Sequence, residues 1–428
     1  MPFNNEIIKP HENEYLNCIR CGLCLAVCPT YREYKNETAS PRGRVALARK
    51  SLEDELFLSP NLVEQMYSCL ACLACNDICP AGIKPADIAI EMRHVAEQVK
   101  PSPWKNNLFG KVIPSSDTME LLTWPLRVYE NLGLRWLVHK LRINKLFPEQ
   151  LRDLEGMLPK QPKNPLRKEL PLISRSTNES KYRVGFFLGC AQSLMFSEES
   201  AATIRVLNRN GCTVITPKET VCCGMPAAGY GRQDLVIEHA KVNIEIFEKE
   251  DLDVIVTDCA TCGSKLREYG DILENDPIWS QKAKNFSSKI RDISEFLMSI
   301  PLEKPTGKID ARITYHDPCH LRRAQKVWKQ PRALMQMIEG VEYVEMEEAD
   351  WCCGSAGSQL ITHYETSTHI LDRKMESLKS TGAEIIASGC PGCQMQLMTG
   401  IRREGWNIKV MHPIQLLDQA YKSQDKEE

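Results

Sequence analysis

Two short runs near the N-terminus decide how this chain is organised. Residues 18–29 read CIRCGLCLAVCP, and residues 69–80 read CLACLACNDICP. Both follow the pattern C-x2-C-x2-C-x3-C-P. In two-cluster ferredoxins, three cysteines of such a run hold one [4Fe–4S] cluster and the fourth holds the other. The pattern therefore predicts two sets of metal ligands, which are Cys18, Cys21, Cys24 and Cys79 for one cluster and Cys69, Cys72, Cys75 and Cys28 for the other.

A zinc site is the main alternative for these runs, because zinc is commonly held by two C-x2-C knuckles around one tetrahedral ion. Four cysteines within eleven residues of one run are more ligands than such a knuckle supplies, which favours a larger iron–sulfur cluster. A framework of disulfides is disfavoured further, since such bonds are rare in the cytoplasm, where we expect this protein.

The composition is typical of a globular protein of two or three domains. The chain has 428 residues, of which 43% are hydrophobic and 26% charged, and its net charge is −2. No cluster of Lys and Arg indicates nucleic acid as a partner. Residues 1–10 lack the apolar core of a signal peptide, and we expect no membrane span. In a cytoplasmic chain, 19 cysteines indicate metal or redox chemistry.

Residues 1–100 are predicted to form a helical two-cluster domain, because residues 45–52, 60–68 and 85–99 have helical character and the alternation typical of strands is nearly absent. Residues 101–180 are predicted to be a connector that ends in a polar linker from residue 158 to 180. Within it, Trp124 and Trp136 stand among Leu, Arg and Lys. This stretch is either a helix on the membrane surface or a helix that packs on a neighbouring domain or subunit.

The remaining chain contains an internal repeat, with predicted units at residues 181–305 and 306–428. Each unit has one cysteine, then a Cys-Cys-Gly segment, then a C-x2-C pair, and equivalent cysteines are 129, 130 or 131 positions apart. A fixed period indicates two copies of one structural unit. The first unit contains Cys190, Cys222, Cys223, Cys259 and Cys262, and the second contains Cys319, Cys352, Cys353, Cys390 and Cys393.

Apolar runs precede the cysteines of both units, at residues 182–188, 253–257, 313–316 and 383–387. Helical stretches lie between them, at residues 198–209, 233–249, 331–339 and 366–379. This alternation predicts a parallel sheet with helices on its faces, and it places the cysteines at the carboxyl edge, where open α/β sheets bind ligands. The expected fold class is therefore α+α/β. Cys212, outside every pattern, is predicted to be a buried structural thiol.

The ten repeated cysteines are candidates for binding a cofactor. Adjacent cysteines are expected to point in different directions, which disfavours one zinc ion and favours an unusual iron–sulfur cluster or a dithiol beside a cluster. A single C-x2-C knuckle with spectator cysteines is the alternative. His316 and His320 flank Cys319 and could ligate a cluster or donate a hydrogen bond to it, whereas the first unit has Phe187 and Ala191 there. No nucleotide-binding fingerprint and no catalytic triad is present, so we assign no catalytic residue.

Further short stretches carry a family resemblance: CPTY at 28–31, PRGR at 41–44, REYG at 267–270, AQK at 324–326 and CCGSAG at 352–357. With the two cysteine runs and the repeat, they resemble the glycolate oxidase iron–sulfur subunit family. The resemblance covers nearly the whole chain and is weakest over residues 101–180.

The resemblance implies two [4Fe–4S] clusters and a partner that binds FAD and oxidises a 2-hydroxy acid such as glycolate or lactate. The chain would pass the electrons to a quinone or another acceptor, in the cytoplasm or at the inner face of the cell membrane. Complete repeats mark the related heterodisulfide reductase subunits B and D, in which they hold non-cubane clusters. The alternatives are therefore a disulfide reductase with one or two such clusters, or the iron–sulfur subunit of a glycerol-3-phosphate dehydrogenase.

Overall fold

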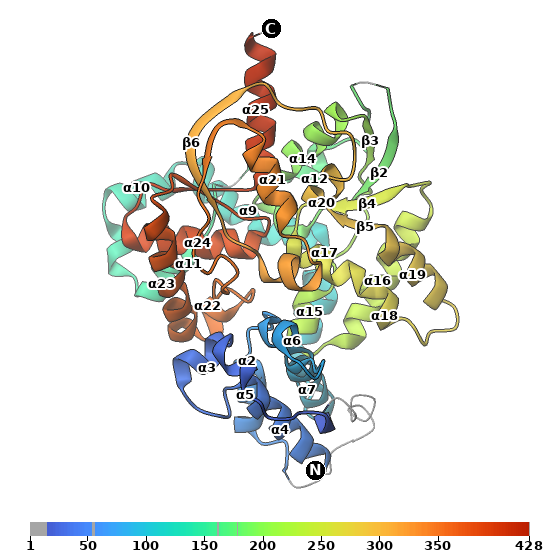
Figure 1. The fold of residues 1–428 in the computed structure, drawn as a ribbon, viewed down its shortest axis with the longest axis vertical. Coiled ribbons are helices and arrows are strands. Elements are labelled where there is room, and N and C mark those ends of the chain that lie inside the picture. The colour runs from blue at the N-terminus through green and yellow to red at the C-terminus, as the bar shows by residue number, and fades with distance from the viewer. Residues whose placement is uncertain (1–14, 54–55, 161, 178, 428) are drawn as a thin grey trace.

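The computed structural model describes residues 15–53, 56–160, 162–177 and 179–427, so the expectation for residues 1–10 lies outside the described residues. Figure 1 shows a helical N-terminal region below two α/β units that stand side by side. The first unit is coloured green to yellow and the second orange to red. This arrangement is the α+α/β architecture that the sequence predicts, and the prediction is confirmed.

The N-terminal region is built from short helices around the cysteine runs. Proline occupies the first position of several of them, where its missing N–H is not needed. Ser40 and Ser59 cap two of these helices by accepting a backbone N–H. Val45, Met66 and Met92 form part of the core between them. The helices are α2 (Leu23–Ala26), α3 (Pro29–Tyr34), α4 (Pro41–Leu52), α5 (Pro60–Tyr67), α6 (Ala74–Ile78) and α7 (Pro85–Val99).

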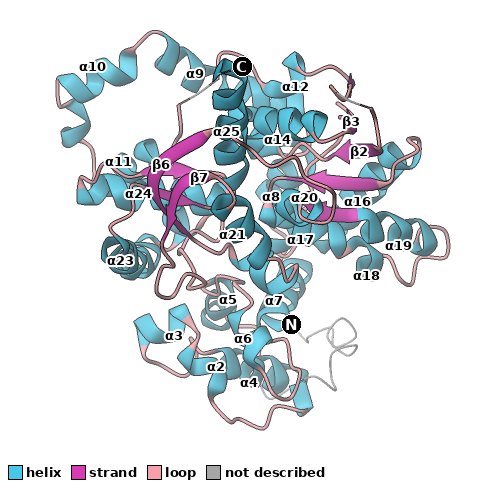
Figure 2. Cartoon of the chain, turned by 45° about the horizontal axis from the view of Figure 1, so that its top comes forward, coloured by secondary structure: helices cyan, strands magenta, loops and turns pink. Residues whose placement is uncertain are grey.

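The connector is also helical, and it runs along the outer side of the two units. Its helices are α8 (Pro103–Asn107), η3 (Leu108–Val112), α9 (Ser116–Asn131), α10 (Leu134–Lys140), η4 (Ile143–Leu146), α11 (Glu149–Gly156) and α12 (Leu166–Glu169). Figure 2 shows α9 and α10 projecting at the edge of the molecule. In the described part of the chain, no helix is long and apolar enough to cross a membrane.

Each unit has a sheet of its own (Figure 2). The first sheet has the order β1-β3-β2-β4-β5 and the second has the order β7-β6-β8-β9. All neighbours are parallel except β1 and β3. The strands are β1 (Ile173–Ser174), β2 (Tyr182–Phe186), β3 (Cys212–Ile215), β4 (Val254–Thr257), β5 (Ile290–Asp292), β6 (Lys308–Tyr315), β7 (Glu339–Tyr343), β8 (Ile385–Ala387) and β9 (Lys409–Met411).

Helices cover the faces of both sheets, and two of them join the units. α14 packs against α25, and Leu207 shares one core with Ile414 and Leu417. The first unit contains α13 (Cys190–Leu194), α14 (Ser197–Arg209), α15 (Met225–Gly229), α16 (Gln233–Glu248), α17 (Ala260–Arg267), α18 (Tyr269–Ile272), α19 (Ser280–Lys289) and α20 (Ile293–Leu297). The second contains η5 (His320–Ala324), α21 (Lys329–Gln336), α22 (Gln359–Thr362), α23 (Tyr364–Thr381), α24 (Pro391–Glu404) and α25 (Pro413–Glu427).

Three details differ from the sequence-based expectations. α21 ends at Gln336, and the chain from Glu339 forms β7, because Gly340 adopts a φ of 83° that a helix does not allow. The short strands β5 and β9 were not predicted, since strands of three residues show little periodicity. Ile173 and Ser174, in the expected linker, pair with β3 as an antiparallel edge strand.

Candidate iron–sulfur sites and a buried series of cysteines

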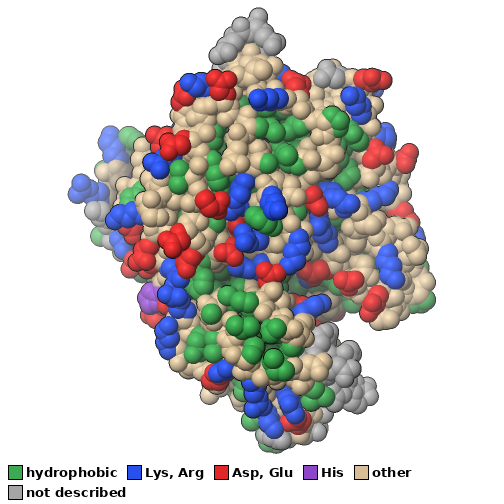
Figure 3. Space-filling model, in the orientation of Figure 1, with side chains coloured by type: hydrophobic (Ala, Val, Ile, Leu, Met, Phe, Trp, Pro, Cys, Tyr) green, Lys and Arg blue, Asp and Glu red, His purple; other side chains and the backbone are tan. Residues whose placement is uncertain are grey.

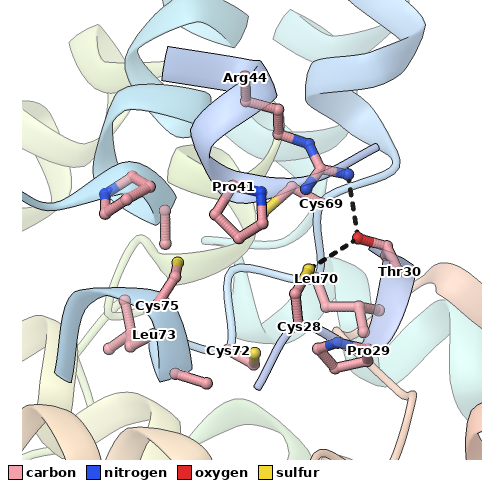
Figure 4. A pocket seen from close by; sticks show the side chains of 13 residues that line it. Cys28, Pro29, Thr30, Pro41, Arg44, Cys69, Leu70, Cys72, Leu73 and Cys75 are labelled. Carbon is pink, nitrogen blue, oxygen red and sulfur yellow. Dashed lines mark hydrogen bonds between the residues drawn. The ribbon is translucent and has the colours of Figure 1, made fainter. Parts of the chain in front are cut away.

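The eight cysteines of the N-terminal runs line two separate cavities. Cys28, Cys69, Cys72 and Cys75 line one of about 350 Å³, and Figure 4 shows their sulfur atoms arranged around a common space. The second cavity, of about 400 Å³, is lined by Cys18, Cys21, Cys24 and Cys79. In both, the fourth cysteine comes from the other run, so the fold brings together the same crossed sets that the spacing predicts.

Left-handed backbone turns shape both runs. Arg20 and Gly22 have φ values of 55° and 85°, and the equivalent Ala71 and Leu73 have 50° and 62°. Three of these residues are not glycine, and a positive φ is unfavourable for them. The surrounding structure must therefore impose these turns. The turns sit on either side of the second cysteine of each run. They fold the first three cysteines around one centre, as a compact multi-iron cofactor requires.

Two arginines lie at these cavities. Arg44 is buried and donates hydrogen bonds to Thr30 Oγ1 (3.1 Å), Ser68 Oγ (3.0 Å) and the carbonyl oxygen of Gln65 (2.7 Å). Thr30 Oγ1 in turn lies 3.3 Å from Cys28 Sγ (Figure 4). Arg42 lines the second cavity and forms an ion pair with Glu37 at 2.6 Å. The stretch PRGR thus places one positive charge beside each cavity.

The electrostatic environment of these thiols is set mainly by burial. Burial raises the pKa of Cys24 to about 11, and it raises that of Cys28, although the Thr30 hydrogen bond and the Arg44 charge act in the opposite direction. Since the thiolate is the form that ligates a metal, these side chains favour a bound cation that stabilises the deprotonated sulfur.

In each repeat the five cysteines form one connected series of thiols. In the first, neighbouring thiols interact electrostatically in the order Cys190, Cys222, Cys223, Cys262 and Cys259. In the second, the order is Cys319, Cys352, Cys353, Cys393 and Cys390, with Sγ atoms of Cys353 and Cys393 3.5 Å apart. The expectation that adjacent cysteines diverge is therefore wrong, because the chain bends at Cys-Cys-Gly instead of running extended.

The glycine that follows each cysteine pair is needed for this bend. Gly224 and Gly354 both have a φ of 89°, which side chains rarely adopt. At Gly354 an added Cβ would lie 2.6 Å from the carbonyl oxygen of Ser367 in α23. The Cys-Cys segment can therefore pack directly against the long helix of its unit.

The middle cysteine of each series has a lowered pKa. Hydrogen bonds from Cys222 and then Cys262 hold the pKa of Cys223 well below its usual value, and Cys352 and Cys393 do the same for Cys353. The neighbouring Cys222 and Cys352 have raised pKa values as the donors. The pKa of Cys190 is also lowered, and that of Cys390 is lowered to about 6, so each repeat favours negative charge at two sulfurs, where a metal or cluster would be stabilised.

The two histidines predicted near Cys319 both lie beside cysteines, with His316 buried and His320 partly buried. His316 lies beside Cys353, and His320 Nδ1 lies 3.5 Å from Cys319 Sγ. Burial lowers the pKa of both imidazoles. Cys212 lies outside both series in the core of the first unit, where burial raises its pKa to about 12, in keeping with the prediction of an inert structural thiol.

The sites follow one another without a break. The thiols of Cys72 and Cys352 interact within one buried cluster, which joins the N-terminal region to the second repeat. Thr261 Oγ1 lies 3.3 Å from Cys390 Sγ, and the Ala260 N–H donates to the carbonyl oxygen of Gly389 at 3.0 Å, which joins the two repeats. A third cavity, of about 470 Å³, opens beside Cys190 and Cys222.

Sequence reasoning missed several residues at these junctions. Arg323 donates to the carbonyl oxygens of Cys72 (3.3 Å) and Asp350 (2.8 Å), so it clamps the N-terminal region onto the second repeat. Lys374 is buried near Cys352 and Cys353. Nothing in the local pattern marks either residue, because both act on segments that are distant in the chain.

Three family models match this chain. The 4Fe-4S dicluster domain matches residues 14–83, and the cysteine-rich domain matches residues 184–267 and 313–398. The model described as glycolate oxidase iron-sulfur subunit, linker region, matches residues 100–158. These spans cover the regions that contain the cysteine sites and the connector.

Characterised relatives are similar along most of the chain. The probable glycolate oxidase iron-sulfur subunit of Bacillus subtilis is 38% identical over 420 residues, which cover 96% of this chain and 94% of the relative. The glycolate oxidase iron-sulfur subunit of Escherichia coli is 30% identical over 94% of this chain and 93% of its own. Lactate utilization protein A of Oceanobacillus iheyensis is 31% identical over 55% of this chain and 96% of its own.

The matched dicluster and cysteine-rich domains agree with the cysteine sites that the fold assembles, and the chain is an iron–sulfur electron-transfer subunit. Because this similarity extends over nearly the full length of both relatives, the chain belongs to the family of glycolate oxidase iron–sulfur subunits.

Proposed function

We propose that this chain carries electrons from an FAD-binding 2-hydroxy acid dehydrogenase, acting on glycolate or lactate, to a quinone or another acceptor. The observation that carries the proposal is the unbroken series of cysteine sites from the exposed Cys21 to the cavity beside Cys190. A reduced flavin gives up electrons singly to iron–sulfur clusters, whose potentials span a wide range. The names of the relatives support the class of substrate.

The cysteines hold the cofactors in this proposal. Cys18, Cys21, Cys24 and Cys79 hold one [4Fe–4S] cluster, and Cys69, Cys72, Cys75 and Cys28 hold the other. The cysteine series of the two repeats hold one or two further non-cubane clusters. The clusters, when bound, supply one-electron transfer, and the protein orients them and excludes water. The division at residues 1–100, 101–180, 181–305 and 306–428 stays a prediction.

The flavoprotein partner is proposed to dock around Cys21. Leu16, Ile19, Leu23 and Ile78 are exposed large apolar side chains near this cysteine, and Ile19 is 69% exposed. Figure 3 shows hydrophobic side chains gathered in this lower part of the molecule, where α2 and α6 lie in Figure 1. An exposed apolar patch beside a redox site is suited to a protein partner that must approach the cluster closely.

The chain is proposed to work in the cytoplasm with α9 and α10 against the inner face of the membrane. These helices carry exposed apolar side chains, among them Leu121, Trp124 and Trp136, and the exposed charges beside them include Lys140 and Arg142. Aromatic and Leu side chains together with basic residues suit the surface of an anionic membrane. A quinone acceptor would be reached there.

Reconstitution tests this proposal. Purified anaerobically with its flavoprotein partner, the chain is expected to be required for glycolate- or lactate-dependent quinone reduction. Leu23→Glu should weaken this activity by disturbing the docking patch. The control Ile278→Glu, at an exposed apolar site in the loop before α19, should not. Quinone reduction that is unchanged when this chain is omitted would sink the proposal.

Disulfide reduction is the second candidate function, and the cavity beside Cys190 and Cys222 favours it. Arg167 and Glu120 line this cavity, so it offers polar groups to a substrate next to the thiols. Iron analysis separates the possibilities, because about eight irons per chain correspond to two cubane clusters alone. Iron in excess of this, lost in Cys223→Ser and Cys353→Ser, is expected if the repeats hold clusters. Turnover of a disulfide by the reduced protein would then favour this second function.

A further inference from the structure

The two repeats are equivalent in backbone but not in the residues around their cysteines. The N–H of Phe187 donates to the carbonyl oxygen of Val256 at 2.9 Å, and the N–H of His316 donates to that of Ala387 at the same distance. Phe187 and His316 therefore occupy the same position, just beyond β2 and β6. The second repeat has an imidazole where the first has an apolar ring.

His316 is placed to act on the cysteines of its repeat. Its side chain is 1% exposed, and neither ring nitrogen has a hydrogen-bond partner of ordinary geometry among the described residues. One of its nitrogens and the Sγ atoms of Cys353 and Cys393 all lie within 4.8 Å of one another. A buried N–H that finds no acceptor is destabilising, so this ring favours a negatively charged sulfur at that place.

A second difference lies on the long helices. Lys374 and Asn243 each stand ten positions after the first residue of α23 and α16. Lys374 is 1% exposed, and its Nζ donates to the carbonyl oxygens of Glu348 (2.5 Å) and Ala349 (3.4 Å). The neutral Asn243 accepts the Val221 N–H at 3.0 Å and donates to Tyr269. A buried ammonium group thus lies near the cysteines of the second repeat alone at this position.

Other charges near the two sites do not cancel this difference. Near Lys374, Glu348 is already paired with Arg373, and Asp350 accepts from Arg323. The first repeat has Lys265 near Cys223, but Lys265 forms an ion pair with Glu268 in the next turn of α17. Both lysines are buried, but Lys374 donates to carbonyl oxygens and has no carboxylate partner among the described residues, whereas Lys265 has one. The second repeat therefore has a buried cation that no carboxylate neutralises, together with an extra hydrogen-bond donor.

We propose that His316 and Lys374 give the iron–sulfur site of the second repeat a higher reduction potential than that of the first. Adding an electron makes a cluster more negative, and a hydrogen bond to its sulfur or a nearby positive charge stabilises that reduced form. His316 acts as an N–H donor to Cys353 and not as an iron ligand, since five cysteines are already present. The inference rests on the proposed clusters in the repeats.

This order of potentials fits the position of the second repeat. Its Cys352 contacts Cys72 of the N-terminal region, so the second repeat is the first to receive an electron from there. The donor cluster is oxidised by one electron and the second-repeat cluster is reduced by one, with no bond formed or broken. The electron then stays at the second repeat until it passes to the first repeat. From there it leaves through the cavity beside Cys190.

Redox titration of the purified holoprotein, followed by EPR and visible absorption, tests the inference. Cys223→Ser and Cys353→Ser first assign the signals, because each removes one repeat's cluster. His316→Phe, which copies the first repeat, and Lys374→Asn are each expected to shift the second-repeat midpoint to lower potential and to leave the first-repeat midpoint in place. His316→Gln keeps an N–H donor and should restore most of the His316→Phe shift.

The outcomes separate this inference from the proposed function. Unchanged midpoints in His316→Phe and Lys374→Asn, in protein with full iron content, overturn the inference and leave the proposed clusters standing. Nitrogen hyperfine coupling typical of an iron-bound imidazole, lost in His316→Phe, also overturns it, since His316 would then be a ligand. If neither Cys223→Ser nor Cys353→Ser loses iron, the proposal that the repeats hold clusters is contradicted, and the inference that rests on it is contradicted too. If the His316→Phe protein loses iron, its midpoint potential is no test. The second-repeat midpoint of Lys374→Asn then tests the inference: a lower potential supports it, and an unchanged one overturns it.

Discussion

The thiol of Cys72 lies beside that of Cys352 in one buried cluster, although one belongs to the N-terminal region and the other to the second repeat. Leu70 and Ala74 pack with Ile370 around this contact, so it is closed to water. Arg323 holds it in place through the carbonyl oxygens of Cys72 and Asp350. The contact makes Cys72 the place where electrons leave one proposed cluster for the next site.

Cys72→Ser is expected to remove one of the two N-terminal clusters. About four irons per chain should be lost, since a serine replaces one of four thiolate ligands of a cubane cluster. Anaerobic iron analysis and EPR measure the loss. Cys212→Ser is the control, because this thiol lies in the core away from every cysteine site, and its iron content should equal that of the wild type. Equal iron in all three proteins would contradict the ligand assignment.

Arg44→Met is expected to destabilise the N-terminal region. The change leaves the hydroxyl oxygens of Thr30 and Ser68 without the donor they share in the core, and it leaves the carbonyl oxygen of Gln65 with the Ser68 hydroxyl as its remaining donor. Orphaned buried acceptors and a lost charge predict a decrease of about 2–4 kcal/mol in the free energy of unfolding. Anaerobic urea unfolding measures the decrease.

Arg49→Met is the matched control for Arg44, on the same helix. Its ion pair with Glu53 is at the surface, with both side chains about one-third exposed. Such a pair contributes less than about 1 kcal/mol. Equal decreases in the free energy of unfolding of Arg44→Met and Arg49→Met would show that Arg44 stabilises the protein no more than a surface arginine does.

Trp124→Ser combined with Trp136→Ser is expected to weaken binding to vesicles that contain anionic phospholipid. Both indoles are more than half exposed, and removing each from a membrane interface should cost about 1.5 kcal/mol or more, which is roughly a tenfold loss of affinity per ring. Co-sedimentation measures binding. Ile278→Ser is the control on the first unit. Unchanged sedimentation of the double variant, or wild-type protein that ignores the vesicles, would assign α9 and α10 to a protein partner.

The stability of the first unit is expected to fall as the pH rises from about 4 to 7. Burial raises the pKa of Asp292 to about 7, compared with about 3.9 in an unfolded chain. Because the folded pKa is the higher one, the unfolded state loses its proton first, and the stabilisation present below pH 4 is lost as the pH passes 7. The full difference is about 4 kcal/mol.

Asp292→Asn tests this pH dependence and keeps a side chain that can cap α20. The variant should gain stability relative to the wild type at pH 8 and little at pH 4, measured as the thermal unfolding midpoint. Asp310→Asn, at an exposed site paired with Lys308, should show no such difference. A gain that does not vary with pH would rule out ionisation of Asp292 as its cause.

Much of the site could be predicted because cysteine spacing acts through local geometry. The interval of three residues, with left-handed turns at Arg20 and Ala71, places the first three thiols of each run around one centre. The apolar runs before Cys259 and Cys390 form β4 and β8, so these cysteines lie at the carboxyl edge as expected. The contact between the adjacent Cys222 and Cys223 was not predicted, since it depends on a bend that packs against a distant helix.

The sequence by itself therefore determined the helical first region, the doubled α/β unit and the membership of every cysteine set. These follow from spacing and periodicity, which are properties of neighbouring residues. Only the tertiary structure decided the order of the sites, from Cys72 to Cys352 and from Cys390 to the first repeat. That order depends on how whole units dock through Arg323, Thr261 and the shared core of α14 and α25, and no local pattern records such packing.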